Sequence, residues 1–204
     1  MPTGTERLPA FIRENYELGE WKHACAILET DFPSEYANVV NVLTDFRVPK
    51  SSLIAGGGGK TRIAQAVDAA FSGRNWREKK FNTSVIVDGE EKKSPTHKVD
   101  CYKNRVALEL EWNNKDPFFD RDLNNFRLLF DLRAISVGII ITRTDELQNV
   151  FDGLYDAKGR CIGPKYGPST THMGKLLPRI QGGGGGGCPI LVLGIKPSLY
   201  VEEL

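Results

Sequence analysis

The chain lacks the features that mark membrane-spanning, secreted and zinc-ribbon proteins. No stretch approaches the roughly 20 consecutive apolar residues that a bilayer-spanning helix needs. The first residues do not combine a cationic region with an apolar run. The 4 cysteines stand far apart without a CxxC pair, so the sequence predicts neither a disulfide framework nor a zinc ribbon. We therefore expect a cytoplasmic protein with reduced thiols.

Length and composition favour one folded unit. The chain has 204 residues, of which 40% are hydrophobic and 26% charged, and this is the usual size of a domain with a substantial core. We expect a single domain over residues 1–204, with a helical N-terminal part at 1–46 and a catalytic core segment at 75–145.

The formal net charge of +1 hides a strong segregation of charge along the chain. Residues 1–46 carry 3 basic and 8 acidic side chains, and residues 106–156 carry 5 and 10. Residues 60–105 carry 11 basic and 6 acidic side chains, and residues 157–204 carry 6 and 2. Two basic stretches thus bracket an acidic centre. That layout suits a polyanion held by cations around metal-binding carboxylates, although solvated surface charge gives the same pattern.

The hydrophobic pattern predicts a mixture of helices and strands. Helical periodicity covers Pro9 to Leu28, Asp31 to Phe46, Thr61 to Gly73 and, with Asp120 as N-cap, the segment to Ala134. Short helices are expected at 145–151 and 173–180. Strands are predicted within 81–87, 97–102, 105–112, 137–142 and 188–195, and residues 152–171 form a long loop. We expect an α/β fold with a mixed central sheet flanked by helices.

Two glycine-rich segments interrupt these elements. The segment SSLIAGGGGK reads as a flexible break, and Gly182 to Gly187 read as a low-complexity loop. The run from Gly56 to Thr61 superficially resembles a phosphate-binding loop, but GxxxxGK[ST] requires glycine at position 54, which is Ile54. We therefore expect no nucleotide cofactor. Lys60 and Arg62 remain candidates for binding the phosphates of DNA.

The most informative segment carries three acids on two neighbouring predicted strands. Side chains alternate along a strand, so Glu109 and Glu111 share one face, while Leu108, Leu110 and Trp112 share the other. Asp100 ends the preceding strand, and the intervening KNR is compatible with a tight turn. A hairpin would bring the three carboxylates within a few ångströms.

Clustered carboxylates repel one another unless a cation lies among them. Mg²⁺ prefers oxygen ligands, usually one or two carboxylates with water and phosphate oxygens, which suits this group. Hydrolysis of a phosphodiester needs a positioned water and neutralisation of developing charge, and bound Mg²⁺ supplies both. The alternative is an amphipathic strand whose acids simply face solvent.

The same residues resemble a known family. Asp100, Glu109 and Glu111 have the spacing of the metal-binding signature of the PD-(D/E)xK nucleases. More narrowly, VDCYKNRVALELEWNNKDPFFDRDLNNFRLLFDL, VGIIITR and CPILVLGI are similar to type II restriction endonucleases of the BglII and BstYI kind. The similarity is best over residues 75–145 and 188–197, and weak at the N-terminus and in the 152–172 loop.

The resemblance implies a restriction-endonuclease-like core in which Asp100 and Glu109 hold metal and Glu111 completes the catalytic set. The position of Glu111 is lysine in the broad superfamily, glutamine in these relatives and glutamate in the related BamHI, so its role stays open. Base contacts map onto Asn113 and Asn114, with a later polar run whose best counterpart is Ser169, Thr170, Thr171 and His172. An asparagine amide offers a donor and an acceptor together, which suits reading of a base edge.

We therefore predict a Mg²⁺-dependent type II restriction endonuclease, with one or two ions per active site. It would act as a homodimer on a short palindrome in double-stranded DNA and leave 5′-phosphate and 3′-hydroxyl ends. Two alternatives remain: a structure-specific or repair nuclease of the same fold, and a non-enzymatic DNA-binding protein.

Overall fold

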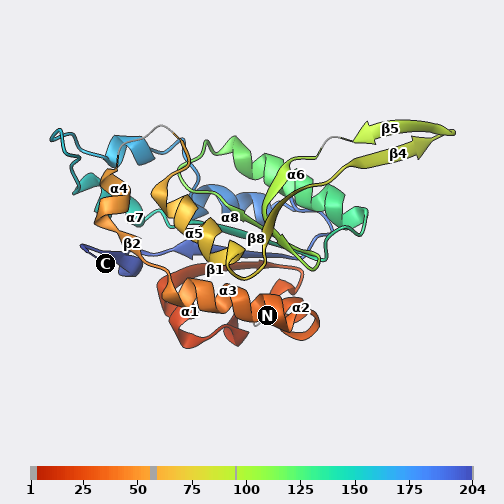
Figure 1. Cartoon of the computed structure of the whole chain (residues 1–204), viewed down its shortest axis with the longest axis horizontal. Coiled ribbons are helices and arrows are strands. Elements are labelled where there is room, and N and C mark those ends of the chain that lie inside the picture. Colours follow the sequence, from red (N-terminus) through yellow and green to blue (C-terminus); the bar gives the residue numbers. More distant parts are fainter. Residues whose placement is uncertain (1–3, 56–58, 95, 204) are drawn as a thin grey trace.

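The computed structural model describes residues 4–55, 59–94 and 96–203, which form three layers around one mixed sheet (Figure 1). Within these residues the central sheet has six strands in the order β1-β9-β8-β7-β6-β3. Strands β7, β8 and β9 run parallel, and β1, β6 and β3 are antiparallel to their neighbours. The strands are β1 (Tyr16–Trp21), β3 (Arg77–Lys80), β6 (Lys98–Lys103), β7 (Val106–Leu110), β8 (Val137–Arg143) and β9 (Ile190–Ile195).

Helices cover both faces of the sheet and bury different hydrophobic clusters. One cluster joins the N-terminal helices, α5 and α7 to one face, and the other joins α6 and α8 to the opposite face. The helices are α1 (Ala10–Asn15), α2 (Ala24–Asp31), α3 (Pro33–Asp45), α4 (Lys50–Ile54), α5 (Arg62–Ser72), α6 (Pro117–Asp131), α7 (Leu147–Asp152) and α8 (Met173–Gln181), with short 3-10 turns at Gly4–Arg7, Gly163–Tyr166 and Pro197–Leu199. The predicted mixed α/β fold is confirmed.

The alternation expected for the central strand β7 is confirmed as well. Val106, Leu108 and Leu110 face the cluster that contains the N-terminal helices, whereas Ala107 faces α6 and α8. Glu109 is 1% exposed, so it is enclosed by the protein rather than solvated. The strand is therefore not an ordinary amphipathic strand with its acids in water.

The periodicity predicted a helical N-terminal part, but the structure contains a strand there. Residues Tyr16–Trp21 form β1, an edge strand antiparallel to β9, between the helices α1 and α2. Only Tyr16 of this strand is fully buried, so its apolar alternation is weak and the flanking helices dominate the pattern. The prediction of a helix over Asp31 to Phe46 is confirmed by α3, which begins at Pro33.

Other boundaries also differ from the predicted ones. Helix α6 begins at Pro117 with Asp116 as N-cap, so Asp120 lies in its first turn. Proline at the first helical position is a start signal because its fixed φ suits a helix and its missing N–H costs nothing there. The first part of the predicted break at 51–60 belongs to helix α4, which begins at Lys50, and Gly56 to Gly58 of the glycine run lie outside the described residues.

Charged strands escaped prediction because they have little apolar pattern. Strand β3 has the sequence REKK, and a separate hairpin pairs β4 (Thr83–Val87) with β5 (Glu90–Ser94), which is mostly charged. This hairpin extends away from the body, with Ile86 72% exposed (Figure 1). A further small sheet pairs β2 (Val48–Pro49) with β10 (Tyr200–Val201). No helix in the described ranges is both long and apolar enough to cross a bilayer.

Candidate active site

The hairpin of β6 and β7 brings Asp100 and Glu109 together. Its turn residues Asn104 and Arg105 both have positive φ, of 43° and 67°, which is the backbone of a tight two-residue turn. The pairing sets Cys101 opposite Leu108. The Asp100 N–H donates to Glu109 Oε2 at 3.2 Å, and the Leu110 N–H donates to Asp100 Oδ2 at 3.2 Å. Two carboxylates from adjacent strands thus face each other across the ladder.

Glu111 lies two residues after Glu109, close to it, and is held by polar partners. Asn114 Nδ2 donates to Glu111 Oε2 at 2.7 Å, and Arg121 Nη2 donates to Glu111 Oε1 at 3.2 Å. Glu111 is itself 1% exposed. It is therefore connected both to a predicted base-reading asparagine and to helix α6.

Helix α6 adds a fourth acid that the sequence analysis did not select. Asp122 is 1% exposed and accepts a hydrogen bond from Arg121 Nε at 2.9 Å. The sequence did contain a signal, because Asp122 falls in the apolar stripe formed by Phe119, Leu123 and Phe126. A buried carboxylate in such a stripe needs a polar or ionic reason to be there.

Burial and mutual repulsion favour the protonated forms of these acids. Burial, with Asp122 and Asp100 close by, raises the pKa of Glu109 well above its ordinary value. Burial and the neighbouring Asp122 raise the pKa of Glu111 to about 9. Burial also raises the pKa of Asp100 and of Asp122. An added cation would favour the ionised forms.

The donor set fits a hard divalent cation held by a pair of carboxylates. Across the described ranges, no group of three or more histidine, cysteine, aspartate or glutamate side chains forms a complete metal cage. Mg²⁺ usually takes only one or two carboxylates and completes its shell with water and phosphate oxygens. Asp100 and Glu109 offer such a pair. Glu109 Oε1 is buried and, in the part of the chain that the structure describes, has no hydrogen-bond partner.

A polar cleft of about 660 Å³ opens beside this pair and is lined by half of the predicted DNA-binding residues. Lys60 and Arg62, at the start of α5, contribute to its lining, and so do Asp100, Asn113 and Asn114. Lys60 and Arg62 lie far from Asp100 in the sequence, but they come close in space because α5 packs against β6. The cleft therefore combines the two cations predicted to bind phosphates, an acid of the pair and amide groups.

The structure adds one group to the cleft, and a second one beside it, that the sequence analysis missed. Lys165, from the long loop, lines it. Asp68 of α5 forms an ion pair with Lys60 and is close enough to Asp100 to raise the pKa of that carboxyl. Asp68 directly follows Val67, which belongs to the buried stripe of α5. This place beside the stripe was the only signal for Asp68 in the sequence.

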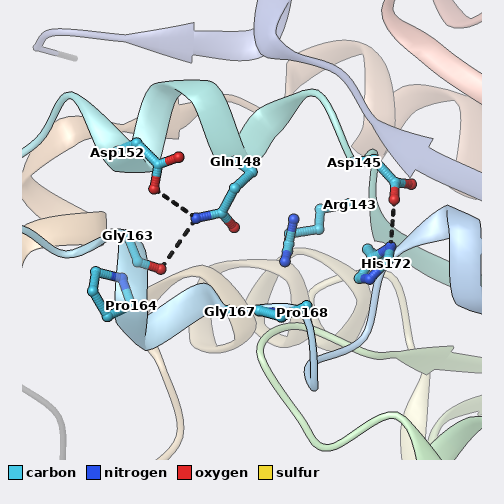
Figure 2. Close-up of a pocket in the computed structure, with 9 residues that line it drawn as sticks. All are labelled: Arg143, Asp145, Gln148, Asp152, Gly163, Pro164, Gly167, Pro168 and His172. Atoms are coloured by element: carbon cyan, nitrogen blue, oxygen red, sulfur yellow. Dashed lines mark hydrogen bonds and ion pairs between the residues drawn. The ribbon is translucent and has the colours of Figure 1, made fainter.

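The later polar run is split between surface and interior. Ser169 is exposed and His172 is partly exposed, whereas Thr170 and Thr171 are 7% and 0% exposed. The Thr171 hydroxyl donates to the Glu111 carbonyl at 3.1 Å. His172 Nδ1 lies 2.8 Å from Asp145 Oδ1 at the edge of a neighbouring pocket, which Arg143 also lines (Figure 2). Of the four predicted contacts, the two threonines face the protein.

A mixed sheet with helices on both faces, carrying paired acids beside a basic cleft, defines a restriction-endonuclease-like nuclease core. Residues 16–195 match the family model described as Restriction endonuclease BglII/BglIII. The match covers most of the 204 residues, so the chain belongs to this family and is a DNA-binding deoxyribonuclease. A comparison with curated individual proteins gave no match.

Proposed function

We propose that the protein is a Mg²⁺-dependent type II restriction endonuclease that cuts double-stranded DNA at a short palindrome and leaves 5′-phosphate and 3′-hydroxyl ends. The observation that carries this proposal is the pairing of Asp100 with Glu109 beside a cleft lined by Lys60, Arg62, Asn113 and Asn114. Membership of the restriction endonuclease family supplies the reaction class.

The residues divide into three proposed roles. Asp100 and Glu109 would hold Mg²⁺, which when bound neutralises the phosphate and activates a water molecule. Lys60 and Arg62 would bind backbone phosphates and set the register of the DNA, because cationic side chains position a duplex without reading its sequence. Asn113, Asn114, Ser169 and His172 would contact bases.

Glu111 would orient the Asn114 amide and the Arg121 guanidinium, between the proposed metal-binding acids and the proposed base-reading residues. Its carboxyl accepts hydrogen bonds from Asn114 and Arg121, so it fixes an amide that we assign to DNA. This arrangement supports a positioning role.

A homodimer is the assembly that suits a palindrome. A two-fold DNA site is matched by a two-fold protein in which each subunit cuts one strand. We expect plasmid DNA to become linear without a large build-up of nicked circles. Analytical ultracentrifugation in the presence of an oligonucleotide duplex measures the stoichiometry directly.

The deciding experiment is digestion of a sequenced phage genome with and without Mg²⁺, followed by mapping of the cut ends. We expect discrete fragments only with the metal, and ends that share one palindromic sequence. A smear of fragments, or cleavage confined to branched or damaged duplexes, would instead identify a structure-specific or repair nuclease. DNA binding with no cleavage in any divalent metal would identify a non-enzymatic binding protein and contradict the proposal.

A further inference from the structure

The buried Arg143 side chain is used by none of the proposed roles, although it lies next to the active site. Arg143 is the last residue of β8 and is 2% exposed. In the part of the chain that the structure describes, no carboxylate lies within salt-bridge distance of its guanidinium, and its Nε has no hydrogen-bond partner. Asp145 lies near enough to favour the charged guanidinium but forms no ion pair with it. A buried cation without a direct ion pair is costly, so its retention calls for a specific reason.

Apart from a 3.4 Å hydrogen bond from Nη1 to the carbonyl of its neighbour Thr144, the partners of Arg143 belong to the long loop or support it. Its Nη2 donates to the Tyr166 carbonyl at 2.7 Å and to Thr170 Oγ1 at 3.1 Å. The guanidinium also lies 5.4 Å from the centroid of the Phe151 ring, which stacks on Tyr166 with centroids 4.0 Å apart. Figure 2 shows Arg143 reaching from the end of its strand toward Gly167 and Pro168 of this loop.

The other end of the same loop segment is attached to the strand that carries the acids. The Thr171 N–H donates to the Asn114 carbonyl at 2.9 Å, and the Asp116 N–H donates to the Ser169 carbonyl at 3.1 Å. The Glu111 carbonyl accepts two hydroxyl hydrogen bonds, from Thr142 at 2.9 Å and from Thr171 at 3.1 Å. The loop is thus joined to the segment that directly follows Glu111.

We infer that Arg143, with Thr171, is a positioning residue for DNA specificity: it holds the loop of residues 166–172 in register with the strand end that carries Glu111. This inference rests on the proposed function. Arginine suits this task because its planar guanidinium keeps Nη2 on both loop acceptors while Nη1 donates to the Thr144 carbonyl, whereas lysine offers a single mobile ammonium. When the loop is held in one position, a wrong base leaves polar groups of the loop unpaired and binding is weaker. A loosened loop can shift and form new contacts with the wrong base, so discrimination falls.

The test uses the full-length protein and two conservative substitutions with matched controls. Arg143→Lys keeps the charge but loses the fork, and Thr171→Val keeps the shape but removes the hydroxyl. Arg160→Lys, in an exposed ion pair with Asp156 of the same loop, is the control for the first. Thr30→Val, on the exposed surface of α2, is the control for the second.

Two measurements separate a positioning role from a merely structural one. In end-mapping on a sequenced phage genome, we expect the share of cuts at sites that differ by one base to rise about tenfold in both variants, the size of a lost base discrimination. In limited trypsin digestion without DNA, we expect faster cleavage after Lys165 in both variants. The controls should match the wild type in both assays.

The outcomes distinguish failure of this inference from failure of the proposed function. If wild-type protein makes no discrete cuts, the proposed function fails, while the trypsin assay still reports whether Arg143 holds the loop. If the wild type cuts discretely but both variants keep its site profile and lose kcat/KM equally at all sites, Arg143 is only structural and the inference is overturned. If Arg143→Lys does not fold, Thr171→Val alone decides.

Discussion

At the scale of single residues, the buried Glu109 and the partly buried Asp100 are proposed to hold a metal ion, which requires charged carboxylates. Asp100 and Glu109 exchange hydrogen bonds through the backbone of each other's strand, but the low exposure of Glu109 disfavours its ionised form. Such sites are built for a function at the expense of stability. Removing the Glu109 carboxylate should therefore lower activity but raise the stability of the metal-free protein.

Glu109→Gln should lower DNA cleavage by at least about 100-fold, a loss typical of removing one electrostatic group from an active site. The same change should raise the thermal midpoint of the metal-free protein at pH 8, because it removes a buried carboxyl that resists ionisation. Binding of Mn²⁺, measured by calorimetry, should weaken, whereas DNA binding in Ca²⁺ should persist. Glu91→Gln on the exposed hairpin is the control and should change none of these. Unaltered cleavage by Glu109→Gln would contradict the proposed role.

The raised pKa of Glu111 predicts that the stability of the protein depends on pH. Burial and Asp122 raise its pKa from 4.5 to about 9 in the folded protein. Between these values the folded state binds more protons than the unfolded state, so the free energy of unfolding falls as pH rises. Below about pH 4.5 the carboxyl is neutral in both states and this dependence disappears.

Glu111→Gln should therefore become more stable than the wild type as pH rises from 5 to 9, by about 1–3 kcal/mol at the upper end, the range for a buried polar group in an unfavourable state. Urea unfolding in the presence of a chelator, at several pH values, measures the difference. A difference that is constant across this pH range would show that the Glu111 pKa is not raised by the fold.

At the scale of elements, the sequence predicted best where hydrophobic pattern and burial coincide. Strand β8, with every residue buried, and helix α5, with a strong apolar stripe, lie where they were expected. Strands β1, β3 and β5 were missed because they lie at sheet edges or outside the main sheet, where few side chains need to be apolar. Their formation depends on a partner strand that the local sequence does not reveal.

The candidate site could be predicted where its residues lie close in the sequence, and not where they come from different elements. Asp100 and Glu109 lie on one short hairpin, so their spacing alone indicated that they meet. Asp122, Asp68 and Arg143 come from other elements, and only packing brings them to the acids or to the loop. For the same reason the sequence could not show that Thr170 and Thr171 face inward.

Close packing between α6 and β8 predicts a sensitive glycine. A Cβ atom on Gly138 would overlap the Phe126 ring, so the helix that carries Asp122 can approach the sheet only over a residue without a side chain. Gly138→Ala should destabilise the protein by about 1–3 kcal/mol, the usual cost of overpacking a core.

Urea unfolding measures this loss. Gly73→Ala is the matched control, because its Cβ would come no closer than 3.4 Å to the Ala69 carbonyl oxygen. In the double variant Gly138→Ala with Phe126→Leu, part of the loss should be recovered, since the smaller side chain makes room. Equal stability of Gly138→Ala and the wild type would mean that α6 shifts freely, and that Asp122 is not held in place by this contact.

At the scale of the whole molecule, charge is arranged around the cleft although the net charge is only +1. Lys60, Arg62 and Lys165 converge there from segments far apart in the sequence. This arrangement predicts DNA binding that depends on salt, because each neutralised phosphate releases a bound counterion.

Arg62→Ala should weaken binding to all duplex sequences alike and reduce the slope of log K against log salt concentration by about 1. Fluorescence anisotropy in Ca²⁺ over a series of salt concentrations measures both quantities. Arg7→Ala, whose side chain pairs with Glu29 at the exposed N-terminal surface, should leave the slope unchanged. A loss confined to one DNA sequence would assign Arg62 to base reading instead.

The two threonine hydroxyls on the Glu111 carbonyl have a consequence for how this enzyme can evolve. If the loop reads the target as proposed, a mutation that moves it also shifts the peptide that carries Glu111. A change of target and a change of turnover should then occur together. Lineages that acquire a new cutting site should therefore carry compensating replacements at 142, 143 or 171, and laboratory selection for altered targets should enrich these positions before any that face the double helix.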